Sequence, residues 1–241
     1  MKNFIVNLKK FNRKERFYLI GYALGNKDFN ISDCFKDKLE EALDNDDIDF
    51  NNELFVAMDY HLDWLYACLY LKEKSIKEDD NYEIEESGIT ATQEDIDFII
   101  MYSDKKDKSK VHMILIEAKG STGWQGKQLI SKANRFDTLF GNDGKKNNGI
   151  IPHFLLMSPN KSNQTRGKKG YEIIVDVETM RFPDFMIKRK DSDNKTLFRH
   201  ICLKFPEKLQ KITRCDISGR KSKKGKYWKI EEEKYHCDNN Q

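Results

Sequence analysis

The stretch EDIDFIIMYSDKKDKSKVHMILIEAKG, from Glu94 to Gly120, contains two apolar runs separated by a polar connection. The runs DFIIMY and VHMILIEA are apolar on both faces, which is typical of strands that helices cover on each side. The connection SDKKDKSK is solvated and favours a turn, so the two strands are expected to fold back on each other. Charged residues stand at the open end of this hairpin, with Asp97 on the first strand and Glu117 and Lys119 on the second.

The hairpin has its midpoint near Asp107, and position 97 reflects through this midpoint onto position 117. An antiparallel pairing therefore predicts that Asp97 and Glu117 lie side by side, with Lys119 on the same face as Glu117. Two carboxylates at that distance repel each other unless they share a proton or a cation. Mg²⁺ prefers such oxygen ligands, and it commonly binds one or two carboxylates together with waters and a substrate phosphate.

Asp97 on one strand, followed by Glu117-Ala118-Lys119 at the end of the next strand and then a helix, resembles the PD-(D/E)xK nuclease superfamily. Ile96 stands where the family has its proline, and the resemblance covers roughly residues 50 to 160. It implies a restriction endonuclease-like fold and hydrolysis of phosphodiester bonds. By the resemblance, Asp97 and Glu117 hold Mg²⁺, which Mn²⁺ can replace, and Lys119 positions or activates the attacking water.

The resemblance implies two further contributions to this site. Members often carry an acid on the helix before the sheet, and Asp59 and Asp63 are the candidates, with Asp63 assigned as a third metal ligand. They are four residues apart, which places them on one face of a predicted helix, where ordinary solvated acids are the alternative. Members also carry a glutamine or a basic residue on the following helix, and Gln128 is assigned to support catalysis. The residues on that helical stripe are Gln125, Gln128, Lys132 and Arg135.

Composition describes a soluble, folded protein. Of the 241 residues, 34% are charged and 38% are hydrophobic, and the mean hydropathy is −0.78. No apolar run is long enough to predict a transmembrane helix, and the N-terminal segment becomes polar too early for a secretory signal. The five cysteines are scattered without a CxxC pair, which indicates reduced thiols and a cytoplasmic protein.

Charge is distributed unevenly along the chain. Residues 28–97 contain 22 acidic and 5 basic side chains, whereas residues 160–230 contain 8 acidic and 20 basic ones. This asymmetry favours an anionic partner for the basic part, expected to be double-stranded DNA, although ordinary solvated faces are the alternative. The residues expected to contact nucleic acid are Lys132, Arg135, Arg166, Lys168, Lys169, Arg220, Lys223 and Lys224.

The order of elements predicts a single α/β domain over residues 1–241 that contains a mixed sheet flanked by helices. It divides into a helical N-terminal part (1–80), a catalytic core (81–178) and a basic, strand-rich extension (179–241). Helices are expected over residues 8–24, 33–43, 53–71 and 124–140. Strands are expected over residues 97–102, 111–118, 150–158, 171–177, 197–205, 211–218 and 226–231, with the last two forming a hairpin over the basic turn GRKSKKGK.

Other functions remain open from the sequence. The same fold without catalysis would make a nucleic-acid-binding or assembly subunit. A third alternative is an interaction protein, in which the acidic N-terminal part of the chain binds a basic partner. Lys119 and Glu117 are also compatible with an ordinary salt bridge at a strand end. The chain contains no GxSxG, Walker or GxGxxG motif. Restriction, phage defence and repair are not distinguished, and a homodimer is left open.

Overall fold

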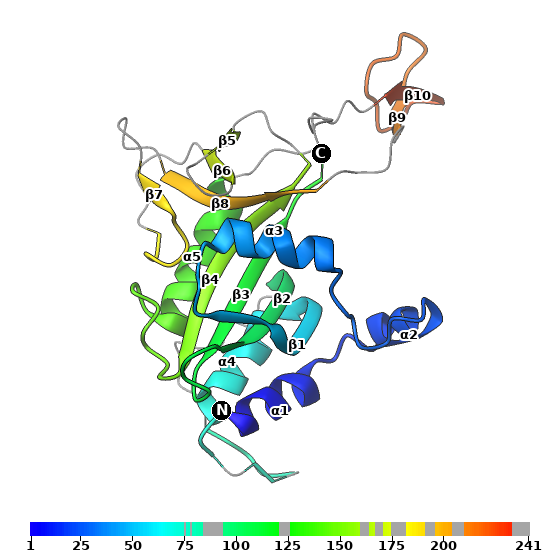
Figure 1. Cartoon of the computed structure of the whole chain (residues 1–241). Helices are drawn as coiled ribbons and strands as arrows, with labels where there is room; N and C mark the ends of the chain where they lie inside the picture. The colour runs from blue at the N-terminus through cyan, green and yellow to red at the C-terminus, as the bar shows by residue number, and fades with distance from the viewer. Residues whose placement is uncertain are drawn as a thin grey trace.

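The structure, a computed structural model, places a mixed β-sheet between helices (Figure 1). Eight strands form this sheet in the order β1-β2-β3-β4-β8-β6-β5, and β7 pairs with β8 at one side. The α/β class with a mixed, helix-flanked sheet is therefore confirmed. The residues that the structure describes are 1–74, 76–77, 79–83, 94–120, 126–159, 164–166, 171–174, 182–190, 196–203 and 210–232.

The central strands combine two kinds of pairing. β1, β2 and β3 are antiparallel neighbours, whereas β3 pairs in parallel with β4, and β4 pairs in parallel with β8. β6 is antiparallel to both β8 and β5. The strands of this sheet are β1 (Ile48–His61), β2 (Asp95–Asp104), β3 (Val111–Ala118), β4 (Ile150–Ser158), β5 (Gln164–Arg166), β6 (Tyr171–Ile174), β7 (Arg189–Lys190) and β8 (Thr196–Cys202).

Helices cover both faces of the sheet and complete two apolar layers. Side chains from α1, α4 and α5 pack with alternate residues of β2 and β3, such as Ile99 and Leu115. On the other face α3 packs over their neighbours, such as Ile100 and Ile116. This alternation explains why both strands are apolar throughout. The helices are α1 (Lys2–Phe11), α2 (Glu15–Ala23), α3 (Asp33–Leu43), α4 (Leu62–Leu71) and α5 (Gly126–Phe140).

The predicted hairpin is confirmed. Phe98 pairs with Ile116 and Ser103 pairs with Val111, so the register places positions 97 and 117 opposite each other. The turn is ordered by Asp104, whose Oδ1 accepts hydrogen bonds from the backbone N–H groups of Lys106 and Asp107 at 2.8 and 2.7 Å.

The helix predicted over residues 53–71 is wrong in its first half. The chain there forms β1, which pairs with β2 from Ile48 to His61, and only α4 is helical. The apolar residues recur at spacings that suit a helix, but the exposed edge of the buried hairpin offers backbone hydrogen bonds that favour a strand. The change of structure falls at His61, whose Nδ1 caps α4 by accepting from the N–H of Asp63.

The helix predicted over residues 8–24 is divided in two. α1 ends at Phe11 and α2 begins at Glu15, with extended backbone at Asn12 between them (φ −72°, ψ 94°). Predictions for α3, α5 and β4 are confirmed, including the cap of α3, where the Ser32 side chain accepts from the N–H of Phe35. The buried stripe predicted on α5 is also confirmed and contains Leu129, Ala133, Phe136 and Phe140.

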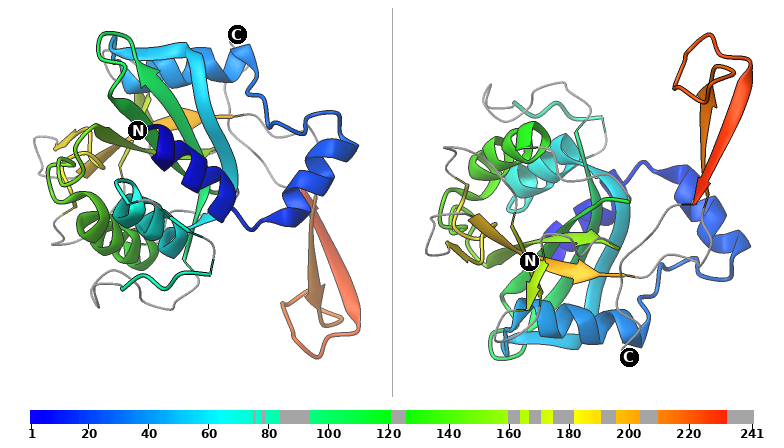
Figure 2. Two further views of the ribbon diagram at one scale, coloured as in Figure 1. Left: turned by 90° about the horizontal axis from the view of Figure 1, so that it is seen from below. Right: turned by 90° about the horizontal axis from the view of Figure 1, so that it is seen from above.

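The last two described strands, β9 (Gln210–Cys215) and β10 (Tyr227–Glu232), form the expected antiparallel hairpin. They make a separate two-stranded sheet that extends away from the main sheet in all three views (Figures 1 and 2). None of the helices in the described ranges is long and apolar enough to cross a membrane.

Candidate active site

Two carboxylates meet where β2 begins and β3 ends. Asp97 and Glu117 lie opposite each other in the antiparallel register, on the face that α4 and α5 cover. Asp97 Oδ2 accepts a hydrogen bond of 2.7 Å from the backbone N–H of Ala118, which fixes this carboxylate against β3. The sequence prediction that the hairpin brings both acids to one place is confirmed.

Gln128 links Lys119 to Glu117. Lys119 Nζ donates to Gln128 Oε1 at 2.5 Å, and Gln128 Nε2 donates to Glu117 Oε1 at 2.7 Å. The end of β3 is held beside β4 because the backbone N–H of Lys119 donates to the carbonyl of Met157 at 2.8 Å. The structure thus brings together the four residues predicted as catalytic, namely Asp97, Glu117, Lys119 and Gln128.

Lys132, one turn further along α5, occupies the second oxygen of Glu117. Its Nζ lies 2.8 Å from Glu117 Oε2, and the two side chains are 4% and 1% exposed. The same ammonium group donates to the backbone carbonyl of Asp95. A buried carboxylate needs such partners, because its charge is far costlier in a protein interior than in water.

Burial dominates the protonation of both acids. Removal from water raises the pKa of Glu117 to about 7, while Lys132 opposes this rise and the charge of Asp97 adds to it. Burial also raises the pKa of Asp97, and the Ala118 N–H and Lys132 oppose that rise. A proton or a cation is therefore favoured between the two carboxylates.

The two acids predicted on a helix before the sheet lie on different elements. Asp63 is in the first turn of α4 and forms an ion pair with Arg135 of α5. Asp59 lies on β1, opposite Asp97, because Met58 pairs with Phe98 and Tyr60 with Ile96. The shared helical face predicted for Asp59 and Asp63 is therefore wrong.

Asp59 on β1, Asp97 on β2 and Glu117 on β3 lie opposite one another and form a row of acids across three neighbouring strands. Asp59, rather than Asp63, is the member of this row on the edge strand. Its charge contributes to the raised pKa of Asp97, and its backbone has a φ of +47°. That left-handed conformation is uncommon for residues other than glycine, and aspartate tolerates it better than most. Asp63 is paired with Arg135, and its assignment as the third metal ligand stays a prediction.

The donor set suits a hard divalent cation. Within the described part of the chain, no group of three His, Cys, Asp or Glu side chains is placed to hold a metal ion by itself. Mg²⁺ does not require one, since it usually retains several waters and binds one or two carboxylates plus substrate phosphate. Each carboxylate oxygen has two lone pairs, so Asp97 and Glu117 can bind an ion while they keep some of their protein donors.

Three of the eight residues predicted to bind nucleic acid lie at the tip of the β9–β10 hairpin. Arg220, Lys223 and Lys224 are exposed there. Lys132 and Arg135 are instead 3% and 7% exposed and pair with carboxylates, so we reassign them from phosphate contact to support of the acids. The side chain of Arg166, in β5, lies outside the described residues, as do Lys168, Lys169 and Gln125.

Two basic residues beside the site were missed from the sequence. Lys14 Nζ lies 2.7 Å from Asp95 Oδ2, and Arg16 lies 3.5 Å from Asp59 Oδ2. Both belong to the segment NRKER, which spans the connection after α1 and the first two residues of α2, and the only signal in the sequence is its cluster of cations. They place two positive charges at the edge of the acid row.

Comparisons with known proteins identify no relative. No protein-family model, no curated protein and no solved structure matches the chain. The function is therefore argued from the site itself.

Proposed function

We propose that the protein is a Mg²⁺-dependent nuclease of restriction endonuclease-like fold that hydrolyses phosphodiester bonds, with DNA as its expected substrate. The observation that carries the proposal is the register of β2 and β3, which sets Asp97 opposite Glu117 with Lys119 two residues further along. This arrangement unites two oxygen ligands and one ammonium group at the open end of a buried hairpin.

Each residue has a distinct role in the proposal. Asp97 and Glu117 hold the cation, Lys119 positions or activates the attacking water, and Gln128 fixes the side chains of Lys119 and Glu117. The bound cation would lower the pKa of a water molecule and neutralise charge that develops on the phosphate. Mn²⁺ serves as an alternative ion of similar ligand preference.

Charge balance favours a phosphodiester as the ligand. Asp97 and Glu117 contribute two negative charges when ionised, and Lys119 and Lys132 contribute two positive ones. A divalent cation would leave this group with a net charge of about +2, which complements a phosphodiester anion and stabilises the additional charge of its transition state.

Basic residues outside the site would neutralise the nucleic-acid backbone. Arg220, Lys223 and Lys224 extend from the exposed hairpin tip, and Arg166, Lys168 and Lys169 belong to the same proposal. Such contacts predict binding that weakens as salt concentration rises. We place the activity in the cytoplasm, because the four cysteines in the described ranges are free thiols. Restriction, phage defence and repair all suit this activity.

The test is cleavage of supercoiled and linear DNA with Mg²⁺ or Mn²⁺. We expect Asp97→Asn and Lys119→Met each to lower the rate at least 100-fold, since each removes a group that would act on the reacting phosphate. Lys106→Ala removes an exposed lysine of the hairpin turn, whose side chain is 80% exposed, and should leave the rate unchanged. Cleavage that survives both site substitutions would refute the assignment of the site.

A non-catalytic role is favoured by one observation. Gln128 donates to Glu117 Oε1 and the Lys132 ammonium group lies 2.8 Å from Oε2, so each oxygen of Glu117 has a protein neighbour without an added ion. A nucleic-acid-binding or assembly subunit would bind DNA without cutting it, and neither Asp97→Asn nor Lys119→Met would alter that binding.

A further inference from the structure

Helix α2 exposes most of its apolar surface. Leu19, Tyr22 and Leu24 at its C-terminal cap are 73%, 75% and 77% exposed, and Ile20 is 50% exposed. Gly21 is the helix's one buried residue. A nine-residue helix that is apolar on several sides and exposed to water is unusual for an isolated protein, because such helices are normally covered.

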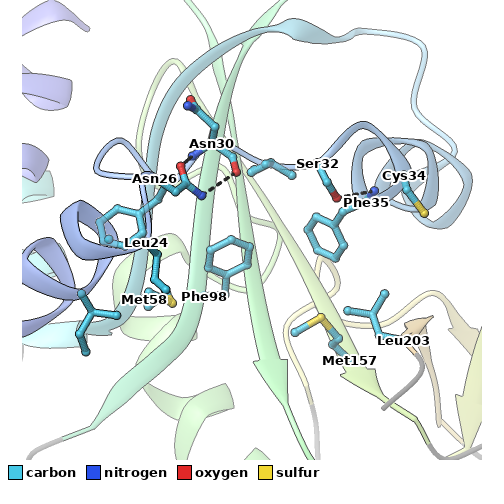
Figure 3. A pocket seen from close by; sticks show the side chains of 14 residues that line it. Leu24, Asn26, Asn30, Ser32, Cys34, Phe35, Met58, Phe98, Met157 and Leu203 are labelled. Atoms are coloured by element: carbon cyan, nitrogen blue, oxygen red, sulfur yellow. Dashed lines mark hydrogen bonds between the residues drawn. The ribbon is translucent and has the colours of Figure 1, made fainter. Parts of the chain in front are cut away.

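An apolar groove continues from this helix. A cavity of about 480 Å³ lies between α2, the following loop, α3 and the sheet. Figure 3 shows side chains of Phe35, Met58, Phe98, Met157 and Leu203 around it. At its rim the side-chain amide of Asn26 donates to the backbone carbonyl of Asn30 and accepts from the backbone N–H of Asn30, and the other walls are mostly apolar.

The groove lies on the opposite face of the sheet from the candidate active site. Phe98 follows Asp97 along β2, and Met157 pairs with Ala118 rather than with Glu117. Successive residues of a strand point to opposite faces, so a partner seated in the groove would not cover the face of the sheet that carries the acids.

We propose that α2 and this groove form the interface of a symmetric homodimer, in which the α2 helices of two copies pack antiparallel across a twofold axis. Leu19 and Tyr22 of each copy lie near the axis and contact the α2 helix of the other copy, beside the groove that Ile20 and Leu24 help to line. Twofold pairing uses one surface patch twice, and a patch that joins a projecting apolar helix to an apolar groove is suited to that symmetry.

Charges at the two ends of α2 favour the antiparallel arrangement. Arg13 and Arg16 precede or begin the helix; their side chains are 75% and 69% exposed and lie 3.5 Å from Glu15 and Asp59, respectively. Exposed acids, Asp28 and Asp33, follow the helix; Lys27 adjoins Asp28, and Lys36 lies 3.6 Å from Asp33. An antiparallel pair brings the basic end of each helix toward the acidic segment of the other, and it also opposes the helix dipoles favourably.

The available area is sufficient for an interface. Four large side chains that are half to three-quarters exposed can bury on the order of 500 Å² per copy, hence roughly 1,000 Å² in total, close to the lower limit for a specific interface. A membrane surface is a poorer occupant, because the acids beside the groove would be repelled by anionic lipid.

The mass of the full-length protein in solution tests the proposal. Sedimentation equilibrium from 1 to 100 μM should show a dimer for the wild type, and Leu19→Asp with Tyr22→Asp should weaken dimerisation at least 100-fold. Ile217→Asp is the matched control, since it places the same charge at an 83% exposed apolar residue of the β9–β10 hairpin and should leave the dimer intact. Circular dichroism establishes that each variant is folded.

Cross-linking tests the symmetry. In a Cys34→Ser background, Leu19→Cys or Tyr22→Cys should yield a covalent dimer on mild oxidation, because residues near a twofold axis meet their own copies. A wild type that is monomeric throughout, a dimer dissociated by Ile217→Asp but not by the α2 changes, or binding to phosphatidylserine vesicles that the α2 changes abolish would each overturn the proposal. These measurements do not depend on nuclease activity, so either proposal can fail alone.

Discussion

Replacing Glu117 with glutamine removes the carboxylate that is most strongly perturbed by burial in the candidate site. The carboxyl is 1% exposed, and its pKa is raised from 4.5 to about 7. Between these two pH values the folded protein holds a proton on Glu117 that the unfolded chain has released. The contribution of Glu117 to the free energy of unfolding is therefore complete below about pH 4.5, and it is lost as the pH rises through about 7.

The size of this effect follows from the two pKa values. A shift of one pKa unit corresponds to about 1.4 kcal/mol, so the contribution of Glu117 declines by about 2 to 3 kcal/mol between pH 5 and pH 8. Glutamine has no such titration. The free energy of unfolding of Glu117→Gln relative to the wild type should therefore increase by about 2 to 3 kcal/mol over the same interval.

Urea denaturation of both proteins at half-unit steps from pH 5 to pH 8 measures this difference. Glu41→Gln, on the exposed side of α3, controls for the loss of one surface charge. Using a difference between variants removes the titration of all other groups. A difference curve for Glu117→Gln that stays flat within 0.5 kcal/mol, like that of a neutral surface change, would refute the claim that burial controls this carboxylate.

Three further predictions follow from the same structure. At pH 8, Mg²⁺ should raise the thermal midpoint of the wild type but not of Glu117→Gln, because an ion that binds only the folded state stabilises it by mass action. Lys132→Met should cost about 3 to 5 kcal/mol at pH 8, measured by urea denaturation, because Glu117 loses its buried partner, and less at pH 5 where Glu117 is protonated. Ser32→Ala should cost about 1 kcal/mol by removing the N-cap of α3, whereas Ser32→Asp should restore the loss.

The hairpin and the positions of its two acids were predictable because neighbouring residues in the sequence determine them. Two apolar runs joined by one polar turn have few ways to pair, and the register that follows sets Asp97 against Glu117. The stripe that carries Gln128 and Lys132 was also predictable, since α5 follows β3 directly and its apolar face is clear. Helical spacing then determines which of its residues lie beside the buried ones.

Contacts between distant segments were not predictable in this way. The spacing of Phe55 and Met58 suits a helix as well as a strand, and only the free edge of β2 decides for a strand. Lys14 and Asp95 are 81 residues apart, and nothing near either position indicates that they form an ion pair. The burial of Lys132 was missed for the same reason, because a lysine beside an apolar stripe is usually exposed.

Lys132 supplies a positive charge that can stabilise the buried carboxylate of Glu117 when no metal ion is bound. Its ammonium group holds Glu117 Oε2, whereas Gln128 holds Oε1 and also contacts Lys119. A cation that binds Glu117 would compete with Lys132 for negative charge, so the lysine should weaken metal binding while it stabilises the metal-free fold. Lys132→Met should therefore destabilise the apo protein yet tighten Mn²⁺ binding, measured by calorimetry at pH 8. A variant that binds Mn²⁺ less tightly would instead show that Lys132 only orients Glu117 for the ion.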